Sequence, residues 1–284
     1  MTGDVGAVGF IGLGQIGAPM AARLADWPGG LHVYDVRPEA AAPLVARGAV
    51  LAGSAAELGA ACDLVSVMVL DDAQVRAVVA ELLTTARPAT VIAVHSTIRP
   101  ETAEELEVTA AEHGVSLLDA PVSGGPTGAA EGRMAVLVGG DREAYERARE
   151  PFGRWAEVVV HFGAAGAGTR AKLARNVIHY VAFTAVAESQ RLAEAAGVDL
   201  RKLGRVVRYT DGLSGGPGAI MLRDSAGPMD PDDGLYEIFD HVRRLGEKDL
   251  DLALSVADQL GVDMPLTALA RQNLSEGLGV TRAD

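Results

Sequence analysis

The chain has 284 residues, of which 49% are hydrophobic and 22% are charged, as in ordinary globular proteins that live in water. Its net charge is −13, and neither half contains the basic run that a nucleic-acid-binding protein needs to neutralise phosphates. No apolar stretch reaches the roughly 18 to 20 residues of a membrane span, so we expect neither nucleic acid nor a membrane as a partner.

The start of the chain and its single cysteine indicate where the protein works. No basic region and no separate apolar segment precede the first glycine motif, so no export signal is expected and a cytoplasmic location is predicted. Cys62 excludes an internal disulfide, and its place after an alanine run is typical of a buried, inert thiol. The length favours two domains, which we place at residues 1–162 and 163–284.

In the first half, short apolar runs alternate with amphipathic stretches. The predicted strands are residues 7–11, 31–34, 64–70, 90–94 and 116–118, the last of them closing the sheet. The predicted helices are residues 19–25, 38–47, 72–85 and 100–113, and three of them have a proline near the start. This alternation predicts an α/β fold: a Rossmann-type, doubly wound parallel sheet with helices on both faces.

Past residue 163 the alternation stops and an all-helical domain is expected. Residues 169–196 are alanine-rich and free of proline, which predicts one long helix of seven to eight turns that joins the domains and ends at Gly197. Further helices are predicted over residues 200–209, 236–260 and 267–277. Residues 210–233, rich in glycine, proline and aspartate, are expected to form a long loop that is mobile or closes over a site.

A dinucleotide-binding motif follows the first strand. Gly12-Leu-Gly-Gln-Ile-Gly17 stands between an apolar run and a helix, the context that this fingerprint requires. Gly12 permits the tight turn, Gly14 lets the backbone approach a pyrophosphate, and Gly17 allows close helix packing. Asp35 ends the second strand, where its carboxylate can accept the ribose hydroxyls of NAD and repel the 2'-phosphate of NADP, although Arg37 offsets part of that repulsion.

Lys172 is the candidate proton-transfer residue. It is one of only three lysines among 25 basic residues, and a lysine, unlike an arginine, can lose its proton when it is desolvated or placed beside another cation. Asn176 lies four residues later on the same helix face, so both side chains can reach one small molecule. The glycine-rich loop Asp119-Ala-Pro-Val-Ser-Gly-Gly-Pro-Thr-Gly128 can offer N–H groups and the Ser123 hydroxyl to a carboxylate.

Five ordered motifs together resemble the beta-hydroxyacid dehydrogenase family, which includes 3-hydroxyisobutyrate dehydrogenase, tartronate semialdehyde reductase and, more distantly, 6-phosphogluconate dehydrogenase. The matching segments are residues 9–20, Ser96-Thr97, residues 119–125, residues 166–176 and residues 248–253. The resemblance implies a Rossmann-type domain followed by a helical domain, with an active site between them. It also implies an oxidoreductase that uses NAD, or else NADP, and forms homodimers or homotetramers through its helical half.

The resemblance assigns roles to single residues. It makes Lys172 the general acid and base of hydride transfer with a small 3-hydroxycarboxylic acid or the matching semialdehyde or ketoacid. The substrate would contact Ser123, Gly124, Gly125, Asn176 and His179. The cofactor would contact Gly12, Leu13, Gly14, Gln15, Ile16, Gly17, Asp35, Val69, Leu70, Ser96, Thr97 and Lys248. No metal ligand is expected.

Two other functions stay open at this point. Imine reductases share the architecture but usually carry another residue in place of Lys172, and a catalytically inactive dinucleotide-binding relative lacks that lysine altogether. In 6-phosphogluconate dehydrogenases an acidic residue stands where this chain has His179, which argues against sugar-phosphate decarboxylation. His179 either lines the pocket or packs within the helical domain.

Overall fold

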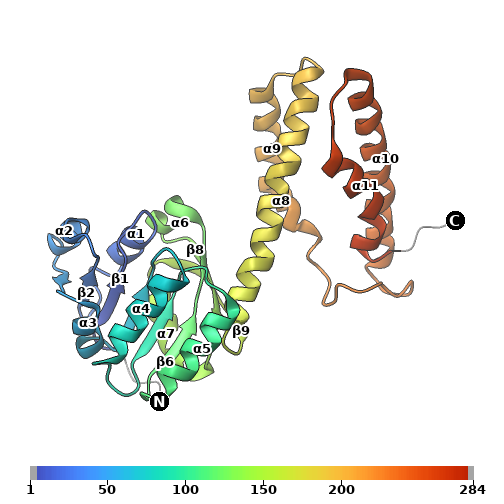
Figure 1. Ribbon diagram of the computed structural model, residues 1–284. Helices are drawn as coiled ribbons and strands as arrows, with labels where there is room; N and C mark the ends of the chain where they lie inside the picture. The colour runs from blue at the N-terminus through green and yellow to red at the C-terminus, as the bar shows by residue number, and fades with distance from the viewer. Residues whose placement is uncertain (1–4, 281–284) are drawn as a thin grey trace. The chain divides into compact units, whose positions relative to one another are not determined.

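A computed structural model describes residues 5–280 of the chain. It divides the protein into two compact units, residues 1–175 and 176–284. The first unit is built around a sheet and the second is helical, as expected from the sequence (Figure 1). Within residues 5–280, no helix combines the length and the apolar character that a membrane span requires.

A nine-stranded sheet forms the centre of the first unit among the described residues. In order across the sheet, the strands are β3 (Val50–Leu51), β2 (Leu31–Tyr34), β1 (Val8–Ile11), β4 (Leu64–Val67), β5 (Val91–Val94), β6 (Ser116–Asp119), β8 (Met134–Gly139) and β7 (Val122–Ser123), and β9 (Ala156–Gly163) pairs with β8. Strands β1 to β6 are parallel. The strand order reverses direction beside β1 and β4, the point where doubly wound sheets bind ligands.

Helices cover both faces of this sheet (Figure 1). One core contains Phe10 and joins the sheet to α1 (Gly17–Ala22), α2 (Ala42–Val45), α6 (Gly125–Glu131) and α7 (Arg142–Gly153). The other contains Val67 and joins the sheet to α3 (Ala55–Ala61), α4 (Asp72–Leu83) and α5 (Pro100–Ala111). The element order confirms the alternation of strands and helices that the sequence predicts. Successive strand residues also face the two cores in turn.

The prediction that the sheet ends near residue 118 was wrong. Strands β7, β8 and β9 extend it, and β8 runs antiparallel to β6 and β7. The apolar run of β8 is bounded by Gly132 and Gly140, which both have positive φ angles, so a strand signal was present there. The short η1 (Pro38–Ala41), together with α2, occupies the predicted helix 38–47.

Helix α8 (Ala167–Ala195) begins in the first unit and continues into the second, close to the predicted bounds of 169–196. The helices α9 (Leu200–Ser214), α10 (Tyr236–Leu260) and α11 (Pro265–Leu278) follow. The expected loop at 210–233 starts later than predicted, because α9 continues to Ser214 and η2 occupies Gly216–Ile220. The last turn of α9 is closed by a hydrogen bond from the N–H of the C-cap residue Gly215 to the carbonyl oxygen of Asp211.

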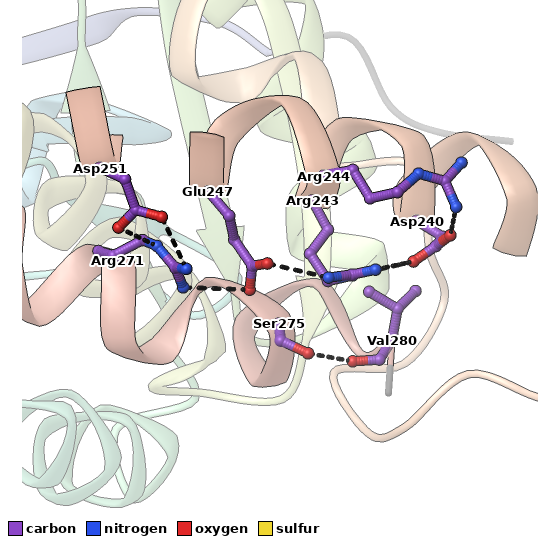
Figure 2. Close-up of polar contacts among 8 residues, drawn as sticks. All are labelled: Asp240, Arg243, Arg244, Glu247, Asp251, Arg271, Ser275 and Val280. Atoms are coloured by element: carbon purple, nitrogen blue, oxygen red, sulfur yellow. Dashed lines mark hydrogen bonds and ion pairs between the residues drawn. The ribbon is translucent and has the colours of Figure 1, made fainter. Parts of the chain in front are cut away.

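An ion-pair network joins α10 to α11 within the second unit (Figure 2). Arg243 is buried and lies between Asp240, at 2.7 Å, and Glu247, at 2.9 Å. Glu247 also pairs with Arg271 of α11, whose Nε lies 2.7 Å from Asp251. These ion pairs join the two helices beside the small apolar cluster that Phe239 of α10 forms with Leu278 of α11.

Candidate active site

The glycine motif forms a tight turn at the carboxyl end of β1. Gly12 has a φ of +89°, and a Cβ there would collide with the carbonyl oxygen of Met68. A Cβ on Gly17 would collide with the carbonyl oxygen of Gly12, whereas nothing lies within 4 Å of the Cβ position of Gly14. Backbone atoms therefore leave no room for a side chain at Gly12 or Gly17, whereas the space beside Gly14 is open. That geometry fits a dinucleotide, because the backbone at Gly14 is accessible to a pyrophosphate.

Asp35 lies beside this turn with its side chain 7% exposed. Its Oδ2 accepts the N–H of Leu13 at 2.7 Å, and its Oδ1 accepts the N–H of Arg37 at 2.8 Å. Burial acts to raise the pKa of this carboxyl, but the two N–H donors and the Arg37 guanidinium lower it overall. The carboxylate is therefore ionised and fixed in orientation. Oδ1 also accepts a long hydrogen bond from Arg37 Nε at 3.4 Å, whereas Oδ2, with one donor, keeps a lone pair for a ribose hydroxyl.

Ser96 fixes the segment that follows β4 by hydrogen bonding. Its hydroxyl donates to the carbonyl oxygen of Val69 at 2.7 Å and accepts the Val69 N–H at 2.9 Å, and its side chain is buried. Thr97 and Leu70 are exposed, and Leu70 is 85% accessible. The structure thus places Val69, Leu70, Ser96 and Thr97 at the carboxyl edge of β4 and β5, next to the strand that carries the glycine turn.

Lys172 lies in the second turn of α8 and is only 8% exposed. Burial, with a smaller contribution from the positive charge of Arg175, lowers the pKa of its ammonium group from 10.5 to about 8. No carboxylate in residues 5–280 forms an ion pair with it, whereas the neighbouring Arg170 pairs with Glu104 at 2.5 Å. A buried amine without an acidic partner, with a pKa near neutrality, can both accept and return a proton.

Residues 119–128 were predicted to form a loop, but Ser123 ends the short strand β7 and only Gly124 separates it from α6, which begins at Gly125. Gly124 and Gly125 have φ angles of +138° and +64°, a backbone conformation that side chains disfavour. A Cβ on Gly124 would come within 2.7 Å of Met134 Sδ, while no atom lies within 4 Å of the Cβ position of Gly125. The half-buried Ser123 and the open backbone at Gly125 are therefore available to a small anion.

Three further predicted residues belong to the second unit. Asn176 and His179 lie on α8 at four and seven residues past Lys172. The His179 ring contacts Phe183, with centroids 4.3 Å apart, and Tyr180 at 5.3 Å. Lys248 lies on α10, 60% exposed, with its Nζ 2.7 Å from Asp249 Oδ1. Contact of these three side chains with substrate or cofactor stays a prediction.

Asp119 is a buried group that the sequence did not single out. It ends β6 with no exposed surface, and its two carboxylate oxygens accept the N–H groups of Gly166 and Thr169 at the start of α8. Burial raises the pKa of this carboxyl, and the two N–H donors oppose that effect. The partners lie 47 and 50 residues away in the chain, so no local pattern could have revealed them.

A dinucleotide turn on a doubly wound sheet, followed by a helix with a buried lysine, defines a dinucleotide-dependent oxidoreductase. Comparison with known proteins makes this assignment narrower. Residues 7–163 match the family described as the NAD binding domain of 6-phosphogluconate dehydrogenase, and residues 166–283 match the one described as NAD-binding of NADP-dependent 3-hydroxyisobutyrate dehydrogenase. The chain belongs to the beta-hydroxyacid dehydrogenase family, and its cofactor is NAD or NADP.

Similar proteins span nearly the whole chain. A crystal structure of an oxidoreductase from Mycobacterium avium 104 is 54% identical, with a TM-score of 0.94 and coverage of 97% of this chain and 99% of that one. The Mycobacterium tuberculosis 3-hydroxyisobutyrate dehydrogenase, solved with L-serine, is 34% identical, with a TM-score of 0.68 and coverage of 95% and 93%. An NAD-dependent L-serine dehydrogenase from Pseudomonas aeruginosa is 34% identical over 274 residues, covering 93% of this chain and 89% of that protein.

Proposed function

We propose that the protein is a dehydrogenase that transfers a hydride between NAD and the hydroxyl carbon of a small 3-hydroxycarboxylic acid, with Lys172 as general acid and base. The single observation that carries this proposal is the environment of Lys172, which is buried, lacks an acidic partner within residues 5–280 and has a pKa of about 8. Relatives described as 3-hydroxyisobutyrate and L-serine dehydrogenases support the same substrate class.

The lysine moves one proton in each turnover. When bound, the oxidised nicotinamide accepts the hydride that leaves the hydroxyl carbon. The free amine of Lys172 accepts the hydroxyl proton as the carbonyl forms, and in the reverse direction its ammonium group returns that proton to the carbonyl oxygen. At pH 7 a minority of Lys172 side chains are free amines, so the oxidation should accelerate as the pH rises towards 8.

The remaining predicted residues would bind and orient the substrate and cofactor. The Ser123 hydroxyl and the backbone N–H groups of Gly124 and Gly125 suit a carboxylate, which accepts charge-assisted hydrogen bonds. Asn176 would orient the substrate, and the glycine turn with Asp35 would hold the adenosine half of the cofactor. Asp35 favours NAD over NADP, because its fixed negative charge repels a 2'-phosphate and the exposed Arg37 offsets that charge only in part.

A second copy of the chain would complete the assembly. Between Asn176 and the end of α8, the apolar side chains of Val177, Tyr180, Val181, Phe183 and Val186 are about half exposed. At 3.6 residues per turn these positions cover more than half of the helix circumference, and so large an exposed apolar surface is typical of an interface between subunits. We therefore propose a homodimer or homotetramer formed through the helical unit.

A substrate panel tests the proposed reaction. Several 3-hydroxyacids that differ in size at the second carbon are assayed by nicotinamide absorbance with NAD and with NADP, alongside a cyclic imine with NADPH. We expect turnover of a 3-hydroxyacid with NAD, and a loss of about 10²- to 10⁴-fold in kcat for Lys172→Ala. The Lys202→Ala variant, which changes an exposed lysine of α9, serves as the control. Turnover of the imine alone, or dinucleotide binding without any turnover, would refute the proposal.

A further inference from the structure

The start of α8 is seated directly on the sheet of the first unit. The carbonyl oxygen of Gly166 accepts the first N–H of the helical ladder, from Arg170, and Gly166 itself has a φ of +82°. A Cβ on Gly168 would collide with the carbonyl oxygens of Leu137 and Asp119. The first turn of the helix therefore lies against the backbones of β6 and β8, at a distance that only glycine permits.

Asp119 fixes that turn by hydrogen bonding. The first N–H groups of any helix have no partner within the helix and need an acceptor from elsewhere. Here Oδ1 of Asp119 accepts the Gly166 N–H at 2.8 Å and Oδ2 accepts the Thr169 N–H at 2.7 Å. A fully buried carboxyl group whose two oxygens both accept N–H groups is costly to displace, because the loss of either bond would leave buried polar groups unsatisfied.

Lys172 follows Thr169 by three residues and therefore lies one turn from these bonds on a neighbouring part of the helix surface. The pKa of Lys172 depends on how deeply its side chain is buried rather than on an ion-pair partner, since no carboxylate of residues 5–280 pairs with it. The charged groups around the first turns of α8 act elsewhere: Glu104 and Glu101 of α5, together with Asp119, act on Arg170, and Arg175 is the cation that acts on Lys172. The interactions that keep the start of α8 buried therefore also determine the pKa of the Lys172 ammonium group.

We propose that Asp119 is the positioning residue of the active site: its carboxylate anchors the start of α8 and thereby holds the Lys172 amine in its buried place. The inference rests on the proposed function in that Lys172 is the group that transfers the proton. Asp119 touches neither substrate nor cofactor in this scheme and acts through the helix. Loosening the anchor would let water reach the amine and would return its proton affinity towards that of a free lysine.

The test measures the titration of Lys172 directly. Because the chain has three lysines, Lys172, Lys202 and Lys248, reductive methylation with ¹³C-formaldehyde gives few NMR signals, and the signal lost in Lys172→Arg identifies the one of interest. Asp119→Asn leaves one acceptor oxygen and places an amide N–H₂ against the other N–H group. We expect the pKa of Lys172 to rise from about 8 to at least about 9, towards the value of a free lysine.

A matched control separates positioning from general stability. Asp141 caps α7 in the same unit by accepting the Ala144 N–H at 2.9 Å, but α7 carries no predicted site residue. Asp141→Ala removes this acceptor and should destabilise the protein while leaving the Lys172 titration unchanged. If Asp119→Asn does not fold, Asp119→Glu keeps the charge and both oxygens but displaces the helix by one methylene, and the pKa of Lys172 should still rise. A folded Asp119 variant with an unchanged Lys172 titration would overturn the inference.

Kinetics supply the second readout. The pH profile of kcat should move upwards with the pKa of the lysine, so that kcat at pH 7 falls about tenfold when that pKa rises by one, while NADH binding at the glycine turn is retained. The NMR titration needs no substrate, so the inference and the proposed reaction can fail separately. A raised lysine pKa in a protein without dehydrogenase activity would refute the reaction alone, and an active Asp119→Asn enzyme with an unchanged profile would refute the inference alone.

Discussion

Each of the two units of the protein is stabilised by a different kind of interaction. In the first unit, residues from both faces of the sheet form two extensive cores, and aromatic side chains such as Phe152 and Trp155 are fully buried. In the second unit, the buried apolar cluster among the described residues centres on Phe239, Leu278 and Val280, and α9 has no buried residue. The apolar cores of the first unit are therefore extensive enough to stabilise it. The second unit depends more on ion pairs and on contacts from outside the unit that bury its apolar side chains.

The largest expected effect contrasts two phenylalanines. Phe152 is fully buried in the first unit and Phe183 is 56% exposed on α8. Phe152→Ala should lower the free energy of unfolding by about 3 to 5 kcal/mol, because it leaves a cavity. Phe183→Ala should leave the unfolding of an isolated chain nearly unchanged but weaken subunit association at least tenfold. Denaturant titration and sedimentation at several concentrations measure the two effects, and a wild-type monomer at micromolar concentration would contradict the proposed assembly.

The glycine turn offers the next contrast. Gly17→Ala should cost about 3 kcal/mol of stability and abolish NADH binding, because its Cβ collides with a backbone carbonyl. Gly14→Ala has free space around its Cβ and should fold normally, yet bind NADH at least tenfold more weakly because the methyl group lies where the pyrophosphate approaches. Thermal melting and NADH fluorescence titration read stability and binding in parallel. Equal stability of the two variants would refute the packing argument.

Lys172 should reduce stability at neutral pH. Its folded pKa of about 8 lies below the unfolded value of about 10.4, so the unfolded chain binds more protons between these values and stability rises with pH across that window. Lys172→Met should raise the free energy of unfolding at pH 7 by up to about 3 kcal/mol, with the advantage lost above pH 10. Lys202→Met, at an exposed site on α9, should give no such gain. Denaturant titrations from pH 6 to 10 would show a flat difference if the ammonium group were well solvated.

The ion-pair network of the second unit gives the smallest effect. Glu247→Gln should destabilise the second unit by about 2 kcal/mol, because Arg243 is largely buried and loses a charged partner. The exposed pair Arg133 and Glu131 of the first unit is the control, and Glu131→Gln should change stability by less than about 0.5 kcal/mol. Chemical denaturation followed by far-UV circular dichroism compares them, and equal effects would mean that the buried network adds no specific strength.

Local patterns were sufficient to predict much of the first unit. The apolar runs of β1, β2, β4, β5 and β6 and the glycine motif each depend on neighbouring residues, so their spacing could be read directly. Strands β8 and β9 were missed, although the apolar run of β8 lies between Gly132 and Gly140. The local pattern could not show that β8 runs antiparallel to β6 and β7. The end of α9 was also misplaced, since Gly212 and Gly215 resemble loop residues although the helix continues to Ser214.

The candidate site likewise contains residues that the sequence could reveal and residues that it could not. Lys172 and Asp35 could be singled out from the sequence, because each stands in a recognisable motif, and their roles stay predictions. The anchoring role of Asp119 could not be found in this way, because its hydrogen-bond partners lie 47 and 50 residues away. The buried state of Ser96 was also invisible in the sequence, since its partner Val69 belongs to the preceding strand segment.

The burial of Cys62 has a consequence for how the protein responds to oxidative stress. Its thiol is fully enclosed, and burial raises its pKa to about 12, so almost no reactive thiolate exists at physiological pH. Peroxides and alkylating reagents attack thiolates. Because this is the sole cysteine of the chain, thiol-directed reagents have no reactive sulfhydryl to attack in the folded protein, and we expect its activity to be insensitive to them.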